Sequence, residues 1–224
     1  MDVEIGIDGV SVGHATDLDL GSGVTAILFD PAAVAAVAVT GGAPGGRDTD
    51  MLAPESTVPA VDALVLSGGS AFGLDAPGGV QAALREAGRG FALRDIRIPL
   101  APGAILFDLA GSGNKAWGRF SPYRELGYAA ARAARPAIAE GSVGAGTGAT
   151  TATAKGGFGI AAETTVAGHR AVALMAVNAL GTATIGDGRW FWAAPYERAD
   201  EFGGAGWPAP LPANALALRT KHAR

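Results

Sequence analysis

Short apolar runs bounded by glycine, proline and aspartate recur in the first third of the chain. They are Val24–Phe29, Val34–Val39 and Ala63–Leu66. Runs of four to eight apolar residues between turn-forming residues are typical of buried strands. The segment Gly41–Asp50 is rich in glycine and polar residues, which predicts a loop. We therefore expect several buried strands joined by glycine-rich loops.

Two longer segments show helical spacing. In Leu74–Ala87 the apolar residues recur near the helical period, Pro77 fits a first helical turn, and Gly88 is a stop signal. The alanine-rich segment Tyr123–Arg135 ends before Pro136, where a helix is expected to end. Both segments therefore predict helices.

The second half begins with a further strand pattern. Phe158–Val166 and Ala171–Val177 predict a pair of strands, with Ala167–Arg170 as the turn between them. Glu201–Arg224 holds several prolines, little periodicity and a basic end, so we expect an extended tail in residues 201–224. No domain boundary is evident, which predicts one layered α/β domain over residues 1–224.

Composition narrows the class of protein. The chain has 224 residues, of which 49% are hydrophobic, and this predicts a packed core. A net charge of -4 argues against a nucleic-acid binder. No apolar run approaches the ~20 residues that cross a bilayer, and the acidic start does not resemble a signal peptide. We expect a cytoplasmic protein with no membrane partner.

Metal and cofactor sites are not expected. The chain has no cysteine, and His14, His169 and His222 lie far apart with no paired ligand spacing. The glycines at Gly68, Gly69 and Gly73 fit neither the dinucleotide nor the P-loop spacing, so a tight turn is favoured over a nucleotide site.

Four residues have candidate chemistry beside an ordinary interpretation. Ser70 follows a strand, as a nucleophile elbow does, but a helix-capping role is at least as good an interpretation. Asn178 ends an apolar strand, where its amide can donate to an oxyanion, although a turn role is favoured. Lys155 fits a surface lysine. Trp192, in the sequence RWFW, fits a pocket wall, a core or an interface.

Six segments, in order, resemble one family. They are Val10–Asp17, Gly23–Asp30, Gly41–Glu55, Val61–Ala76, Gly141–Gly159 and Ala176–Gly181. Together they are similar to the conserved segments of the DmpA-type aminopeptidases, which include β-peptidyl aminopeptidases and, more distantly, the nylon-oligomer hydrolase. The resemblance covers most of the chain.

The resemblance implies a self-cleaving enzyme with an N-terminal nucleophile. A precursor of this family cuts itself before a Ser or Thr, which becomes the nucleophile at the start of a short β-fragment. The implied fold is a four-layer αββα sandwich, a type shared with ornithine acetyltransferase, in which a separate β-fragment completes the structure. The implied partners are that β-fragment, other αβ units in a homo-oligomer, and a small peptide or amide substrate, with no cofactor.

The expected nucleophile segment, Asn-Thr-Thr or Gly-Ser followed by a strand, is missing from this sequence, so we expect the chain to be an α-fragment with its nucleophile elsewhere. We expect Asn178 and Lys155 to act in catalysis, and Ser70, Phe72 and Trp192 to bind substrate. Two departures bear on this. The nylon-oligomer hydrolase has a tyrosine in the glycine-rich turn that matches the one containing Phe72 here. The loop before Lys155 is shorter than in those members that carry a lysine directly after the Gly-Ala-Thr run.

Two other functions remain open at this point. One is an acyltransferase like ornithine acetyltransferase, whose motifs fit less well. The other is a non-catalytic assembly protein, if no β-fragment exists.

Overall fold

The computed structural model describes residues 2–221, which form two compact units. The first unit comprises the residues up to Ala149 together with Gly156–Asn178. The second comprises Thr150–Lys155 and the residues from Ala179 onward. His222–Arg224, the last residues of the expected basic tail, lie outside the described residues. The single domain inferred from the sequence stays a prediction.

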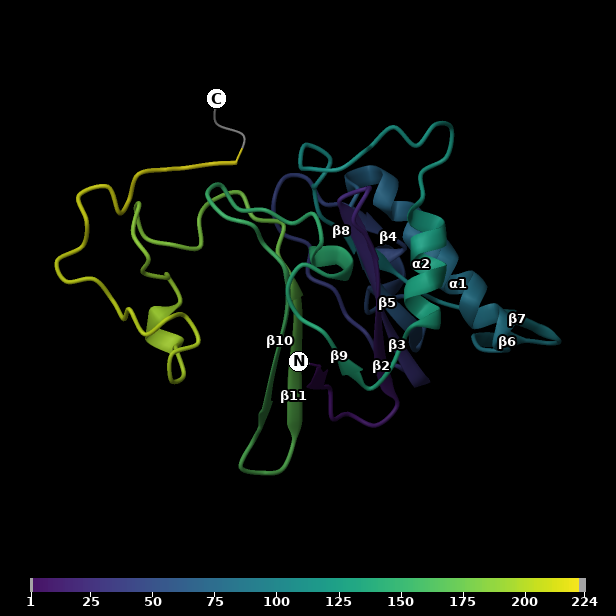
Figure 1. Cartoon of the computed structure of the whole chain (residues 1–224). Coiled ribbons are helices and arrows are strands. Elements are labelled where there is room, and N and C mark those ends of the chain that lie inside the picture. The colour runs from purple at the N-terminus through teal and green to yellow at the C-terminus, as the bar shows by residue number, and fades with distance from the viewer. Residues whose placement is uncertain (1, 222–224) are drawn as a thin grey trace. The chain divides into compact units, whose positions relative to one another are not determined.

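The first unit contains both α-helices and all the strands of the described chain (Figure 1). The strands are β1 (Val3–Glu4), β2 (Val10–Asp17), β3 (Ser22–Ala33), β4 (Gly46–Arg47), β5 (Val61–Ser67), β6 (Phe91–Leu93), β7 (Ile96–Ile98), β8 (Gly103–Ile105), β9 (Ala137–Ile138), β10 (Phe158–Thr164) and β11 (Arg170–Ala176). The α-helices are α1 (Ala76–Glu86) and α2 (Tyr123–Arg132), and the 3-10 helices are η1 (Thr49–Leu52), η2 (Ser70–Asp75) and η3 (Gly144–Gly146).

A five-stranded sheet in the order β2-β3-β5-β8-β4 forms the centre of this unit. Its neighbouring strands are antiparallel except for β5 and β8, which run parallel with Val65 opposite Gly103 and Ser67 opposite Ile105. The carboxyl ends of these two strands therefore meet at the same edge of the sheet. That edge holds the candidate site.

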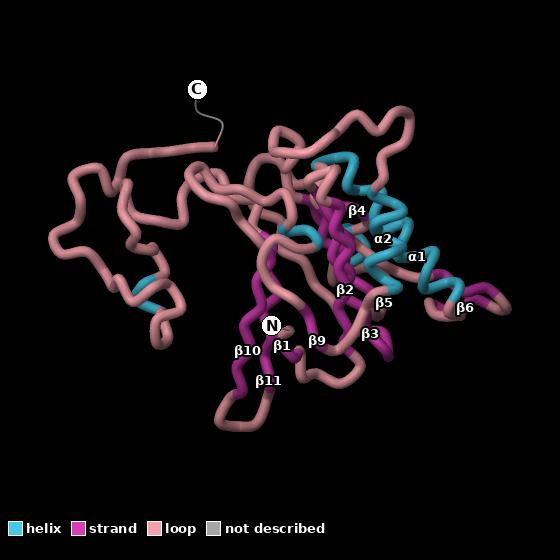
Figure 2. The backbone as a smooth tube through the Cα atoms, in the orientation of Figure 1, coloured by secondary structure: helices cyan, strands magenta, loops and turns pink. Residues whose placement is uncertain are grey.

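Helices α1 and α2 lie side by side on one face of the sheet (Figure 2). Val24, Ala26 and Leu28 of β3 pack into the core on this side. The helices approach closely because glycines lie at their contact: a Cβ added at Gly79 would overlap the Arg124 carbonyl oxygen, and one at Gly127 would overlap that of Ala76.

Strands also cover the opposite face of the sheet. Ile27 of β3 packs there against Ile5, Ile138 and Phe158, with residues of the β10–β11 hairpin beside them. The unit thus has a helix layer, a central sheet and a second layer of strands. This confirms the layered α/β fold predicted from the sequence and supplies the first three layers of an αββα sandwich.

The two predicted helices and the predicted hairpin are confirmed within a few residues. Pro77 lies in the first turn of α1, and Gly88, just beyond its end, has the left-handed φ of 71° that favours glycine. The predicted strand at Val34–Val39 is wrong. Strand β3 ends at Ala33, and the following residues pair with no strand of the described chain. Val34, Val37 and Val39 are exposed. This apolar segment therefore forms a surface that the described residues leave uncovered.

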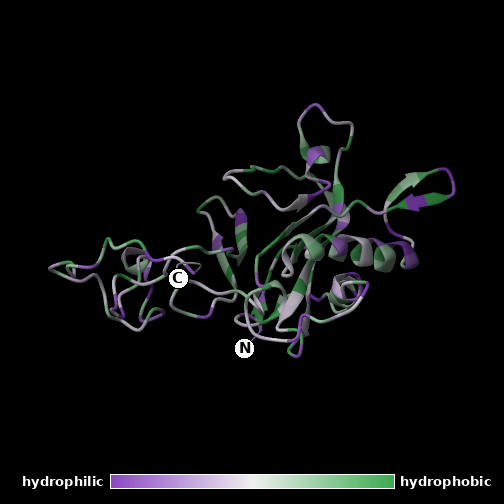
Figure 3. Ribbon diagram, turned by 90° about the horizontal axis from the view of Figure 1, so that it is seen from above, coloured by the Kyte–Doolittle hydropathy of each residue, from purple (hydrophilic) through white to green (hydrophobic). Residues whose placement is uncertain are grey.

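The hairpin β6–β7 projects beyond α1. Its residues Phe91, Leu93, Ile96 and Ile98 are exposed, and hydrophobic positions are visible along it in Figure 3.

The second unit has no strand among its described residues, and its one helix is the 3-10 helix η4 (Ala194–Tyr196). Two aromatic pairs lie within it: Phe191 contacts Phe202 at 5.4 Å, and Trp192 contacts Trp207 edge-on at 6.0 Å, both between ring centroids. Across the described part of the chain, no helix combines the length and the apolar character that spanning a membrane requires.

Candidate active site

The candidate site is built where β5 and β8 end together. Strand β5 runs into the turn Gly68–Ser70, and β8 runs into the segment Leu106–Asp108. The two are joined by backbone hydrogen bonds: Leu106 N–H donates to the Ser67 carbonyl at 2.8 Å, and Ser70 N–H donates to the Leu106 carbonyl at 2.9 Å. The parallel pairing thus continues past the ends of both strands.

The turn itself has an unusual backbone. Gly69 and Ser70 both have left-handed φ values, 84° and 52°. A non-glycine residue in this region is uncommon and carries strain, so the surrounding bonds must hold Ser70 there. Gly69, and not Ser70, occupies the N-cap position of η2, with no side-chain capping bond. The structure therefore gives no support to the capping interpretation of Ser70.

Asn178 reaches the same place from a distant part of the chain. It follows β11, and its Oδ1 accepts a hydrogen bond from Phe107 N–H at 3.0 Å. Because a backbone N–H needs an acceptor, this bond fixes which amide atom faces Phe107. The Nδ2 group of Asn178 is left on the other side, as a donor on an exposed surface. The bond spans 71 positions of sequence, unlike the local bond of an asparagine turn.

A buried polar cluster lies directly beneath the turn. Asp108 is 2% exposed; its Oδ1 accepts from Gly69 N–H at 2.7 Å and its Oδ2 from the Ser22 hydroxyl at 2.6 Å. The Tyr123 hydroxyl in turn donates to Ser22 Oγ at 3.0 Å. Burial raises the pKa of Tyr123 to about 12, so this phenol keeps its proton near neutral pH and remains a donor.

The cluster has no room for larger groups. A Cβ added at Gly68 would overlap both the Asp108 carboxylate and Ser22 Oγ. One added at Gly148 would lie 2.5 Å from Asp108 Oδ2. The glycine-rich segments around Gly68 and Gly148 therefore meet at this carboxylate, and this close approach is one physical reason for their glycines.

Phe72, in the helical turn after Ser70, is half exposed. Its ring contacts Trp117 edge-on at 5.2 Å, and Trp117 contacts Tyr123 at 6.0 Å between centroids. This line of aromatic rings runs from the surface to the buried phenol. It gives the site an apolar wall on the side of Phe72.

A second polar network supports the glycine-rich turn at η3. His14 Nε2 lies 3.0 Å from the Ala139 carbonyl, and its Nδ1 lies 2.8 Å from Thr25 Oγ1. Since the carbonyl only accepts, Nε2 carries the proton and Nδ1 accepts from Thr25. Thr25 Oγ1 also accepts from Ala145 N–H at 3.0 Å. Burial lowers the pKa of His14, which favours this neutral form.

The structure thus brings together three of the five residues selected from the sequence. Asn178, Ser70 and Phe72 belong to the first unit, where Leu106 and Phe107 connect Asn178 to Ser70. Lys155 and Trp192 belong to the second unit. Lys155 is exposed, and its backbone forms an isolated antiparallel β-bridge with Thr150. Trp192 is 39% exposed and its ring contacts Trp207.

Sequence reasoning missed Asp108, Ser22 and Tyr123. A usable signal was present at Asp108, since a lone carboxylate directly after the apolar run Ala104–Phe107 must find partners if it is buried. Ser22 and Tyr123 gave none, because their partners lie 86 and 101 positions away.

Comparison with known proteins gives consistent matches. The sequence profile described as peptidase family S58 matches residues 5–200. An uncharacterized aminopeptidase of Mycobacterium tuberculosis is 44% identical over 183 residues, which cover 78% of this chain and 52% of the relative. Its counterpart in Mycobacterium leprae is 42% identical over 193 residues, with the same coverage. The chain therefore spans about half the length of the curated relatives it matches.

Solved structures share the fold. A β-aminopeptidase of a Burkholderia species matches with a TM-score of 0.61 at 24% identity, over 80% of this chain and 52% of that one. The L-aminopeptidase D-Ala-esterase/amidase of Ochrobactrum anthropi matches with a TM-score of 0.52 at 21% identity, over 71% of this chain and 47% of that one. The latter is described as a variant of the Ntn hydrolase fold.

Proposed function

Because the chain belongs to peptidase family S58, we propose that it is the α-chain of a self-cleaving aminopeptidase or amidase. The curated relatives are named aminopeptidases, and this chain spans 52% of their length. The nucleophile, a Ser or Thr at the start of a β-fragment, belongs in this proposal to the part of the protein that the chain does not span. The α-chain supplies groups that bind the substrate and stabilise the transition state.

The observation that carries the proposal is the anchored amide of Asn178. Its Oδ1 is held by Phe107 N–H, so its Nδ2 has a fixed direction and is available as a donor. A preorganised donor of this kind stabilises an oxyanion because little reorganisation is needed when the negative charge develops.

The exposure of Asn178 fits a site that a second fragment completes. Strand β11 is apolar on both faces: Leu174 and Ala176 pack inward, while Met175 and the following Val177 are each 56% exposed. Strands that are apolar on both faces are normally covered on both. Cover by a β-fragment would exclude water from the Asn178 amide and so strengthen its interaction with an oxyanion.

The chemistry follows from a nucleophile that is also a chain terminus. Its α-amine accepts the hydroxyl proton, directly or through water, while the oxygen attacks the amide carbonyl. The tetrahedral oxyanion receives a hydrogen bond from Asn178 Nδ2. Collapse expels the amine product, which takes up the proton, and leaves an acyl-enzyme. Water then attacks the acyl-enzyme by the same route and releases the acid.

The other selected residues take supporting roles in the proposal. Ser70 and Phe72 line the substrate pocket, and the aromatic contact of Phe72 with Trp117 makes that wall apolar. Lys155 acts near the terminal amine, where its charge would lower the amine pKa and keep the amine neutral and basic. Trp192 forms part of a pocket wall.

The proposed partners follow from the same picture. They are the β-fragment, further αβ units in a homo-oligomer, and a small peptide or related amide in the cytoplasm. Part of Trp190–Tyr196 forms an interface or pocket wall, since Tyr196 is 81% exposed in a segment rich in aromatic residues. Light scattering tests the oligomer: a single αβ unit in solution contradicts it.

The decisive experiment uses the complete gene product. Mass spectrometry and N-terminal sequencing are expected to find two polypeptides, the smaller one starting with Ser or Thr. The processed protein is expected to hydrolyse aminoacyl p-nitroanilides, and replacing that first residue by alanine is expected to abolish both cleavage and hydrolysis. A single uncleaved polypeptide with no hydrolysis would contradict the proposed function.

A further inference from the structure

The segment Leu106–Asp108 makes three sets of contacts at the candidate site. The Leu106 carbonyl accepts from Ser70 N–H, Phe107 N–H donates to Asn178 Oδ1, and the Asp108 carboxylate accepts from Gly69 N–H. Three consecutive residues thus join the strained turn to the Asn178 amide. Whatever fixes this segment also fixes the direction of the proposed oxyanion donor.

The Asp108 side chain anchors the segment Leu106–Asp108. It is buried at 2% exposure and receives a backbone donor at 2.7 Å and a hydroxyl donor at 2.6 Å. Hydrogen bonds to an ionised carboxylate are stronger than those between neutral groups. Ser22, at 0% exposure, cannot exchange this partner for water. Its hydroxyl is itself oriented by the donor Tyr123.

We infer that Asp108 is a positioning residue, which holds Phe107 N–H and, through it, the Asn178 amide in the direction needed for oxyanion stabilisation. It does not touch the substrate. In the Tyr123–Ser22–Asp108 series, the Tyr123 hydroxyl donates to Ser22 and the Ser22 hydroxyl donates to one oxygen of the Asp108 carboxylate. Gly69 N–H donates to the other oxygen of that carboxylate. The inference rests on the proposed oxyanion role of Asn178.

The test is a double-mutant cycle on the processed complete protein. Asp108→Asn keeps the shape of the side chain, and its oxygen can still accept from Gly69 N–H. Its N–H₂ group, however, faces the Ser22 hydroxyl, so two donors meet where a carboxylate accepted before. This disturbs the Tyr123–Ser22–Asp108 series of hydrogen bonds. We expect kcat for an accepted aminoacyl p-nitroanilide to fall about ten- to a hundredfold, because small misplacement of a catalytic group has effects of this size. KM should change less than about twofold, since the affected hydrogen bond forms mainly in the transition state.

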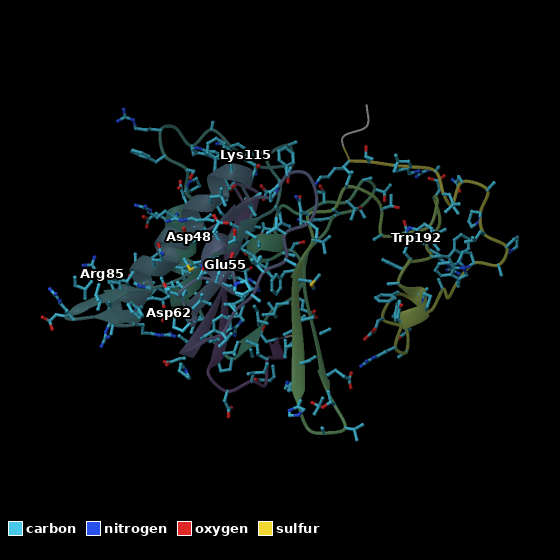
Figure 4. All side chains as sticks on the ribbon, turned by 180° about the vertical axis from the view of Figure 1, so that it is seen from behind. Asp48, Glu55, Asp62, Arg85, Lys115 and Trp192 are labelled. Atoms are coloured by element: carbon cyan, nitrogen blue, oxygen red, sulfur yellow. The ribbon has the colours of Figure 1, made fainter. Side chains whose placement is uncertain are left out.

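The cycle separates positioning from stability. In an Asn178→Ala background, Asp108→Asn should lower kcat by less than about twofold, because the donor it orients is gone. Asp62→Asn is the matched control: Asp62 is also a buried carboxylate, 7% exposed, that accepts a backbone N–H, from Leu100 at 2.8 Å. Asp62 lies at the start of β5, whereas the candidate site lies beyond the end of that strand. Lys115 marks the site in Figure 4, because its ammonium group donates to the carbonyls of Leu20 and Gly21, which precede Ser22. Asp62 is far from Lys115 in that view. Its replacement should leave kcat unchanged.

Each outcome has a definite meaning. Equal losses from Asp108→Asn in both backgrounds, or an equal loss from Asp62→Asn, overturn the positioning role while leaving the oxyanion role intact. Wild-type turnover in Asn178→Ala overturns the oxyanion role and the inference with it. If Asp108→Asn does not fold, Ser22→Ala takes its place, since it keeps the carboxylate and removes its side-chain donor. If a variant is not processed, the rate of self-cleavage serves as the readout in the same cycle.

Discussion

At the scale of single residues, the direction of one amide carries most of the functional argument. Asn178 follows a strand, and from the sequence its side chain suits a local turn as well as an oxyanion. The structure gives its Oδ1 a partner 71 positions away and leaves its Nδ2 facing out. Sequence spacing cannot reveal this contact, because it depends on how β8 is placed beside β5.

Replacing Asn178 by alanine in the complete protein is expected to lower turnover by about 10²–10³-fold, the usual effect of removing one oxyanion donor. The fold should survive, with a stability loss of about 1 kcal/mol for the bond to Phe107. Single-turnover hydrolysis and melting temperature, measured on the same preparation, separate the two effects.

Asn114→Ala is the matched control for that experiment. Asn114 is also exposed, and its Oδ1 also accepts a backbone N–H, from Ala116 at 2.9 Å. A purely structural role for Asn178 predicts that both variants lose similar stability and keep normal turnover per folded molecule.

Stability should also depend on pH through His14. Burial lowers the pKa of His14 from its ordinary value of 6.5, and Arg135 adds to this effect, while the bond to Ala139 opposes it. The unfolded chain therefore takes up a proton at a higher pH than the folded chain does. The free energy of unfolding should fall as the pH drops below about 6.5 and level off below the lowered pKa.

The measurement is the melting temperature between pH 8 and 5.5, where His14→Gln should flatten the curve. His169→Gln, which removes an exposed histidine, is the matched control. Equal pH dependence in wild type and His14→Gln would contradict the assigned protonation state.

At the scale of elements, the contact between α1 and α2 depends on which glycine faces the partner helix. A Cβ at Gly79 would overlap the Arg124 carbonyl oxygen, whereas one at the adjacent Gly78 would lie 3.3 Å from the flexible guanidinium of Arg124. Gly79→Ala is therefore expected to destabilise by about 1–3 kcal/mol, as overpacking does.

Gly78→Ala should instead be neutral or stabilise by up to about 1 kcal/mol, because alanine is the better helix former. Denaturant unfolding of the two variants compares them directly. Equal effects would mean that the helices do not approach through Gly79.

Local signals predicted several of the longer elements, although the eight-residue strand β2 was not among them. The spacing of α1, the alanine-rich α2 and the β10–β11 pair were visible because their patterns repeat over seven or more residues. Strands β4 and β8, with two and three residues, carry no such pattern and exist because a neighbour pairs with them. The error at Val34–Val39 has a related cause, since an apolar run indicates burial without saying which surface provides it.

At the scale of the whole molecule, the chain presents apolar surfaces that its described residues do not cover. They lie at Val34–Val39, on the outer side of β11 and along the hairpin β6–β7. Exposed apolar surfaces of this kind indicate interaction sites or a tendency to aggregate. The first two would be natural contacts for a second fragment.

Expressed alone, residues 1–224 are therefore expected to be poorly soluble, and coexpression with the remainder of the protein should restore solubility. Size-exclusion chromatography and thermal melting measure this. A monomeric chain that melts cooperatively on its own would contradict the expectation.

The hydrogen bonds around Leu106–Asp108 also set an order of events during folding. They connect residues 39, 71 and 86 positions apart, and contacts of such separation form late because their loop-closure entropy must be offset first. If self-cleavage uses the same oxyanion donor, the scissile bond cannot be cut until these distant segments have met. The cut would then act as a quality check: a misfolded precursor would remain inert, and only a completed molecule would release its nucleophile.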